Sequence, residues 1–130
     1  MMSREERIEY EILDCILNHR GDEGVSTTVP GFMMRLVALF PGIQVGEFAS
    51  ACRRLLALDA LDLSVFDKAD GVRRDYRDGR DDVEFFYADP KTKLHLRASA
   101  ASRAQFTRLA ALIELPAAFK RWMGQHGRTY

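Results

Sequence analysis

One short stretch of this sequence carries side chains that can read nucleic-acid bases. Glu47, Ser50 and Arg54 are spaced i, i+3 and i+7, so a helix would place them in one row. Gln44 lies just before this row and Arg53 beside it. Arginine makes two hydrogen bonds to guanine, glutamine pairs with adenine, and glutamate accepts from cytosine N4. The row predicts base contacts in a DNA major groove; the alternative is the solvated face of an amphipathic helix.

A second group of arginines lies in residues 68–82, which hold five basic and five acidic side chains. Arginine inserted into a narrow minor groove is an established way for a loop to bind DNA. The interleaved aspartates neutralise the local charge and would limit phosphate affinity. A self-paired surface loop is therefore the alternative. The side chains that we expect to contact DNA are Arg73, Arg74, Arg77 and Arg80.

The sequence offers little for catalysis or metal binding. His19, His95 and His126 lie far apart on different expected elements. The HExxH, CxxC, GxSxG and P-loop patterns are absent. Cys15 and Cys52 lie in apolar helical patterns, where a free cysteine behaves as a small buried hydrophobe. We therefore expect a protein that is not an enzyme and has no metal site and no cofactor.

Length and charge favour one globular domain with an uneven charge distribution. The chain has 130 residues and a net charge of zero, which argues against a strongly basic coat for nucleic acid. Residues 97–130 nevertheless hold six Lys or Arg against Glu114 alone, and residues 30–58 carry a net charge of +2. These segments would form a basic face if they meet. No signal peptide and no apolar run near 18 residues is present, so we expect a cytoplasmic protein without membrane contact.

Apolar spacing predicts three helices in the first half of the chain. The first covers about 4–19 and begins after Ser3, a suitable N-cap. The second opens at Pro30, and the third covers 45–58 with Glu47, Ser50, Ala51, Arg53 and Arg54 outward. The second helix is expected to be heavily buried through Phe32, Met33, Leu36, Val37, Leu39 and Phe40.

The second half of the chain changes to strand patterning. Alternation predicts a strand near 61–66, a long hairpin loop over 68–82 and a returning strand over 83–88. A short third strand is expected near 94–98 and a short extended piece at 25–29. Ser99 is then expected to cap a long final helix.

This order of elements resembles the winged helix-turn-helix superfamily. The resemblance rests on GFMMRLVALF-PGIQ-VGEFASACRRLLALDALDL at 31–63, a buried helix, a short turn and a second helix that leads into a strand. The stretch LHLRASAASRAQFTRLAAL at 94–112 resembles the end of many such domains. The resemblance to this superfamily implies an α+β fold with a three-helix core, a β-hairpin wing and an additional C-terminal helix. Helix 45–58 would then read the major groove.

The resemblance implies a winged-helix domain over 1–114 and a C-terminal helical extension over 115–130. Phe119, Trp122 and Met123 of the extension must be buried, on their own domain or in a partner or homodimer contact. The expected function is that of a bacterial DNA-binding transcription regulator. It would bind double-stranded DNA as a monomer or as a homodimer. The alternative is a winged-helix protein-interaction module without nucleic acid.

Overall fold

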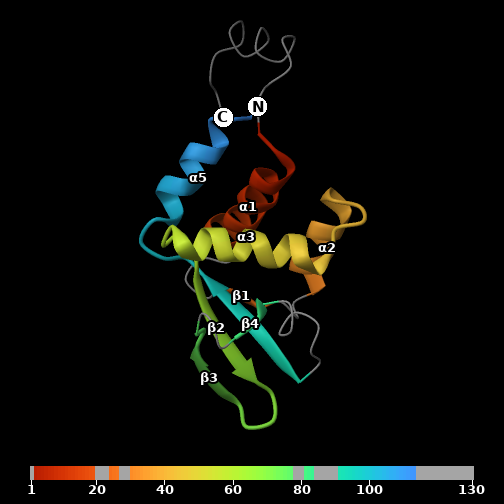
Figure 1. The fold of residues 1–130 in the computed structure, drawn as a ribbon, viewed down its shortest axis with the longest axis vertical. Coiled ribbons are helices and arrows are strands. Elements are labelled where there is room, and N and C mark those ends of the chain that lie inside the picture. Colours follow the sequence, from red (N-terminus) through yellow and green to blue (C-terminus); the bar gives the residue numbers. More distant parts are fainter. Residues whose placement is uncertain (1, 20–23, 27–29, 78–80, 84–90, 114–130) are drawn as a thin grey trace, which may run out of the picture.

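The computed structural model describes residues 2–19, 24–26, 30–77, 81–83 and 91–113. These residues form four α-helices and a four-stranded antiparallel sheet, so the α+β class is confirmed. Figure 1 shows the helices gathered on one side of the sheet, with α3 running between α2 and α5. No helix among the described residues is long and apolar enough to cross a membrane.

The first helix, α1, covers Arg4–Asp14 and begins with a capping box. Ser3 Oγ accepts from the Glu6 N–H at 3.2 Å, and Glu6 Oε1 accepts from the Ser3 N–H at 3.1 Å. Both bonds satisfy N–H groups that the first turn cannot pair internally. The expected helix over 4–19 is confirmed only in part, because Cys15–His19 continue as a π-helix, η1.

The turn between α2 (Pro30–Leu39) and α3 (Val45–Ala57) lies where the sequence predicts it. Gly42 has a φ of +80°, a conformation that suits glycine. The expected burial of α2 is wrong on one side. Phe32, Leu36 and Phe40 recur every fourth residue and are buried, whereas Val37 and Leu39 are exposed. A single stripe at this spacing covers only one face of a helix. Of the remaining apolar side chains, Met33 packs partly against the core, whereas Met34, Val37 and Leu39 are exposed.

The sheet contains β1 (Val25–Ser26), β2 (Asp62–Asp67), β3 (Val72–Asp75) and β4 (Thr92–Arg97) in the order β1-β4-β2-β3. The expected strands near 61–66 and 94–98 are confirmed by β2 and β4. The expected extended piece at 25–29 is confirmed at Val25–Ser26 by β1, and residues 27–29 lie outside the described residues. The long loop over 68–82 is wrong, because the chain turns at Gly71 and β3 pairs directly with β2. Val83 is helical rather than the start of a strand, and residues 84–88 lie outside the described residues.

The core lies between α1, α3 and the inner face of the sheet. Leu63 and Val65 of β2 face Leu96 and Leu94 of β4 in register, and all four are buried. Phe48 of α3 belongs to the same buried cluster, and its ring lies edge-on to that of Phe32 of α2 at 6.3 Å between centroids. Each fully buried side chain of this size contributes roughly 1.5–3 kcal/mol relative to an exposed one. On α3, Ala51 is buried as well, against the expectation that it lies outward.

The helix after the sheet, α5, covers Ser102–Ala110. Ser99 does not cap it, because Ala101 occupies the N-cap position. Ser99 instead donates from Oγ to the backbone carbonyl of Asp59, and its N–H donates to Ser102 Oγ at 2.8 Å. These bonds join the end of α3 to the start of α5. The predicted C-terminal helical extension over 115–130 lies outside the described residues.

Candidate nucleic-acid interface

The first turn of α3 is occupied by bonds within the chain. Gln44 donates from Nε2 to the Gly42 carbonyl at 2.9 Å, and its N–H donates to Glu47 Oε1 at 3.0 Å. Arg4 of α1 donates from Nε to Glu47 Oε2 at 2.7 Å. The Arg4 guanidinium, and then the Gln44 N–H, hold the pKa of Glu47 below its usual range. Gln44 and Glu47 therefore fix the start of α3 and its position on α1.

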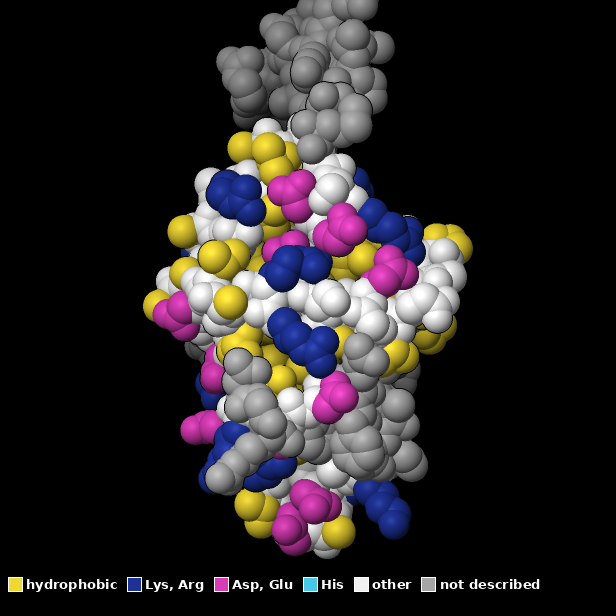
Figure 2. Space-filling model, in the orientation of Figure 1, with side chains coloured by type: hydrophobic (Ala, Val, Ile, Leu, Met, Phe, Trp, Pro, Cys, Tyr) yellow, Lys and Arg dark blue, Asp and Glu magenta, His cyan; other side chains and the backbone are white. Residues whose placement is uncertain are grey.

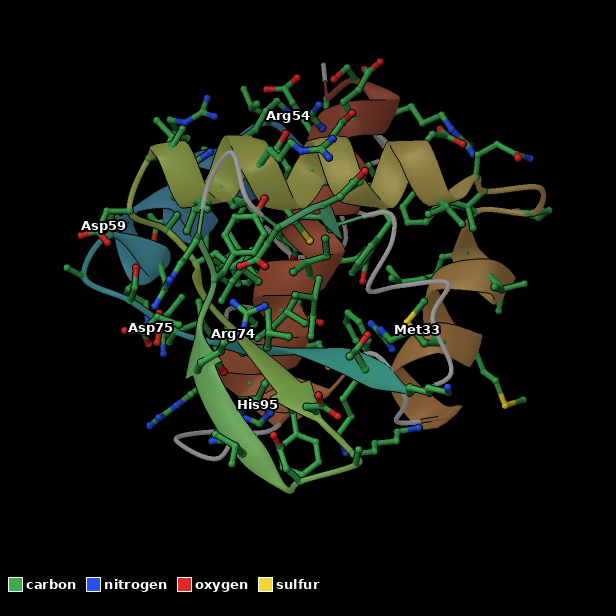
Figure 3. All side chains as sticks on the ribbon, turned by 60° about the horizontal axis from the view of Figure 1, so that its bottom comes forward. Met33, Arg54, Asp59, Arg74, Asp75 and His95 are labelled. Carbon is green, nitrogen blue, oxygen red and sulfur yellow. The ribbon has the colours of Figure 1, made fainter. Side chains whose placement is uncertain are left out.

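Arg54 of α3 forms an ion pair with a buried carboxylate. Its Nε lies 3.1 Å from Glu9 Oε2 on α1, and the Glu9 side chain is only 6% exposed. Arg54 Nη2 is itself buried and has no hydrogen-bond partner among the residues that the structure describes. Releasing Arg54 to an outside partner would leave Glu9 buried without a counter-charge, which costs several kcal/mol in the buried limit. In Figure 3 Arg54 lies on the side of α3 that faces away from the sheet.

Arg53, the next residue of α3, has a different kind of partner. Its Nη2 lies 3.1 Å from Asp82 Oδ1, and the two side chains are 43% and 62% exposed. Ion pairs this exposed contribute about 0–1 kcal/mol to stability. Ser50 is also exposed, one turn earlier on α3. Of the residues expected to contact bases, Gln44, Ser50 and Arg53 are exposed, and the side chain of Gln44 is bonded to the Gly42 carbonyl.

A third arginine, Arg74, binds the acidic segment formed by Asp81 and Asp82. Arg74 of β3 donates from Nη1 and Nη2 to the two carboxylate oxygens of Asp81, each at 2.8 Å. The Arg77 N–H donates to the same carboxylate at 2.6 Å. Arg74 foremost, and then the Arg77 N–H, hold the pKa of Asp81 below its usual range against the effect of burial. Adjacent Asp81 and Asp82 therefore bind one arginine from β3 and one from α3.

Arg73 alternates with Arg74 along β3 and so lies on the opposite face of the sheet, in register with Phe66. Arg73 and Arg77 are exposed, and Arg80 lies outside the described residues. The structure thus brings Arg53 and Arg74 to one acidic segment. It does not place Arg73 and Arg74 on one surface.

A shallow groove runs along the outer side of α3. Its volume is about 390 Å³, and Glu5, Gly46, Glu47, Ser50 and Arg54 line it. The acidic side chains at this groove reduce its attraction for phosphate. Figure 2 shows the same mixture on a larger scale, with basic side chains over the middle of α3 and acidic ones around them.

An apolar face of α2 is the feature that sequence reasoning missed. Met33, Met34, Val37 and Ala38 line a groove of about 400 Å³ on this helix. Met34 is 69% exposed and Val37 is 52% exposed. The signal was present in the sequence, because a helix with apolar side chains on every side cannot bury all of them against one core. The expected partner-binding residues Phe119, Trp122 and Met123 lie outside the described residues.

Within the described ranges, no three His, Cys, Asp or Glu side chains gather as metal ligands. His95 of β4 is half-buried and lies in register with Ser64 of β2, which is buried. Comparisons with family models, with curated proteins and with solved structures gave no match to this chain.

Proposed function

We propose that this chain is a winged-helix DNA-binding module with the character of a transcription regulator. Support comes from the succession of α2, a tight turn and α3, followed by an antiparallel sheet whose strands β1, β4 and β2 lie side by side. In a winged helix the second helix of such a pair enters the major groove. The observation that carries the proposal is the exposure of Ser50 and Arg53 on that helix.

Ser50 and Arg53 make the base contacts in this proposal. Arg53 leaves Asp82, an exposed partner, and binds a guanine edge or a phosphate instead. One bidentate base contact is worth about 1–3 kcal/mol of discrimination, which exceeds the roughly 0–1 kcal/mol of an exposed ion pair. Gln44, Glu47 and Arg54 act as positioning residues, since their contacts lie within the chain.

Arg73 of β3 and Arg77 just after it contact the phosphate backbone of the DNA. Arg74 holds Asp81 in place. At least one aspartate lies within three residues of each of these arginines in the sequence. Few phosphates are therefore neutralised, and the affinity falls less steeply with salt than in a strongly basic protein.

Fluorescence anisotropy with a labelled mixed-sequence duplex, titrated at several salt concentrations, tests the proposal. We expect binding at low salt and an affinity at least fivefold lower for Arg53→Ala, in line with the loss of about 1 kcal/mol or more. Arg103→Ala is the matched control, because Arg103 is an exposed arginine on α5. Absence of binding at low salt, or equal losses in the two variants, overturns the proposal.

A protein-interaction module is the second candidate, and the apolar groove on α2 favours it. The outer side of α3 is mixed in charge and largely self-paired, whereas the α2 groove has no partner among the described residues. Absence of duplex binding, combined with an association that Val37→Gln abolishes, would favour this function over DNA binding.

A further inference from the structure

The outer face of the sheet carries a row of two cations around an aromatic ring. Phe66 of β2 lies in register with Arg73 of β3 on one side and with Lys93 of β4 on the other. Side chains that are opposite in register share one face of a sheet. Val65, the preceding residue of β2, is buried in the core, so Phe66 lies on the face away from it. Arg73, Phe66 and Lys93 therefore form one row across the outer face.

Two further lysines continue this row towards the end of the β2–β3 hairpin. The Lys68 N–H donates to the Lys91 carbonyl at 3.0 Å, which extends the pairing of β2 with β4 by one step. Both lysines are exposed, and alternation places them on the outer face. Like charges directly opposite one another destabilise a sheet, so a bound anion would relieve this repulsion. We call Phe66, Lys68, Arg73, Lys91 and Lys93 the hairpin-end patch.

The aspartates near the hairpin-end patch leave its surface positive. Asp67 alternates to the inner side of β2. Asp70 lies in the turn after β2, where its Oδ1 accepts from the Val72 N–H at 2.9 Å. Asp75 is on the outer face but one row away, in register with Ser64. The four cations of the patch therefore outweigh the acidic side chains around them and attract anions.

We propose that the hairpin-end patch binds single-stranded nucleic acid, with one base stacked on Phe66 and phosphates bound by the cations around it. Phe66 is half-buried, and the Lys93 ammonium lies 4.8 Å from the centroid of its ring. Aromatic side chains on an open sheet, surrounded by cations, bind unpaired bases and the backbone that joins them. In the complex the base takes the place of the ammonium over the ring, and Lys93 binds a phosphate.

The shape of the patch favours a single strand over a duplex. Neighbouring strands of a sheet are about 4.8 Å apart, so the strands that carry Arg73 and Lys93 are about 10 Å apart with Phe66 between them. A ring at the centre of such a surface does not reach bases that are paired and stacked inside a duplex, whereas unpaired bases can stack on it. An acidic peptide or a lipid surface would use the cations but not the ring.

This inference goes beyond the proposed function and does not depend on it. Figure 1 shows the turn between β2 and β3 at the end of the molecule away from α1 and α5. The residues proposed to contact bases in a duplex, Ser50 and Arg53, lie on α3. Arg73 belongs to both proposed surfaces, so the test changes Phe66 and the lysines and leaves Arg73 in place.

Fluorescence anisotropy of the full chain with labelled oligothymidylate and oligouridylate of about 15 nucleotides tests the role of the ring. We expect Phe66→Leu, which keeps an apolar side chain without the ring, to bind at least fivefold more weakly, as for the loss of one stacked base. Phe66→Tyr keeps the ring and should bind like the parent protein. Urea denaturation of each variant shows that it is folded.

A salt titration of the same complexes tests the role of the lysines. The double variant with Lys91→Gln and Lys93→Gln should lower the slope of log affinity against log salt by about 1.4, the value for two phosphates of a single strand. Arg103→Gln is the control for loss of a cation, because Arg103 is exposed on α5, and it should leave the slope unchanged.

Binding of either oligonucleotide that depends on Phe66 supports the inference, and the tighter of the two identifies the strand as DNA or RNA. Equal affinities of the parent protein and Phe66→Leu overturn it. Binding to polyglutamate or to phosphatidylserine vesicles that matches the oligonucleotides overturns it as well, because the surface then selects anions without regard to bases. If duplex binding fails while Phe66-dependent binding of a single strand persists, the proposed function is wrong and this inference stands.

Discussion

Arg54 on α3 and Glu9 on α1 form an ion pair of 3.1 Å in which the carboxylate is almost completely buried. The neighbouring Arg53 pairs with Asp82 at the same distance, but both of those side chains are exposed. Adjacent arginines of one helix thus have opposite tasks. Arg54 joins α3 to α1, whereas Arg53 pairs with a carboxylate at the exposed surface.

Replacement of these two arginines should separate stability from binding. We expect Arg54→Ala to lower the free energy of unfolding by about 2–3 kcal/mol, because it leaves the Glu9 carboxylate buried without its partner. Arg53→Ala should lower it by less than about 1 kcal/mol. Urea denaturation of both variants measures the difference. Glu9→Gln should restore part of the stability of Arg54→Ala, and equal losses in the two arginine variants would contradict this assignment.

Gly24 should be the least replaceable of the described glycines. It has a φ of +74°, and a Cβ at this position would lie 2.5 Å from the Leu96 carbonyl oxygen of β4. Gly42 has a similar φ of +80° but open space around it. Gly42→Ala should therefore cost about 1–2 kcal/mol from backbone conformation alone. Gly24→Ala should cost more, with a lower Tm by thermal unfolding. A smaller loss for Gly24→Ala would be inconsistent with the close approach of β4.

The two cysteines should be unreactive in the folded protein. Both are buried, and burial raises the pKa of the Cys52 thiol far above its ordinary value, against the influence of Arg53 and Arg54. The thiolate is the reactive form of a cysteine. Because the pKa of Cys52 is raised, almost none of its thiol is ionised at neutral pH. Titration with a thiol reagent should detect no fast-reacting group until denaturant is added. Rapid reaction of Cys52 under native conditions would show that α3 opens readily.

Acid should weaken the link between Arg74 and Asp81. The pKa of Asp81 is lower in the folded protein than in the unfolded chain, so the ionised form stabilises the fold at neutral pH. This contribution is lost as the pH falls below about 4 and approaches the folded pKa. Asp81→Asn should therefore be less stable than the parent protein near pH 7, and the two should converge in acid. Asp75→Asn, an exposed neighbour on β3, is the control. A difference that stays constant with pH would contradict the role of this ion pair.

Periodicity was sufficient to predict the helices and the two central strands. The stripe from Phe48 through Cys52 to Leu55 fixes the buried face of α3, and the alternation around Leu63 fixes β2. The position of the third strand, β3, depends on strand pairing, which periodicity does not show. The β3 strand has no apolar alternation in its sequence, VRRD, and all four of its residues are exposed. Its position depends on pairing with β2 and on the turn at Gly71, which no count of apolar residues detects.

The candidate site was predictable as a set of positions but not as a set of roles. The outward row on α3 and the arginines beyond β2 were visible as polar residues at helical or loop positions. Their partners lie far away in sequence, as with Arg4 and Glu47 or Arg54 and Glu9. An ion pair between distant residues depends on how the helices cross, and this geometry is a property of the packed core.

The pairing of Val25 in β1 with Leu96 in β4 also has a consequence for the order of folding. The two residues lie near opposite ends of the described chain, and Tyr10 of α1 likewise stacks on Phe106 of α5 at 4.9 Å between ring centroids. Contacts between such distant residues slow the search for the native state. During synthesis, α1, α2 and α3 leave the ribosome well before β4 and α5 do. The apolar surface of the N-terminal half therefore stays uncovered until the last strand and helix have been synthesised.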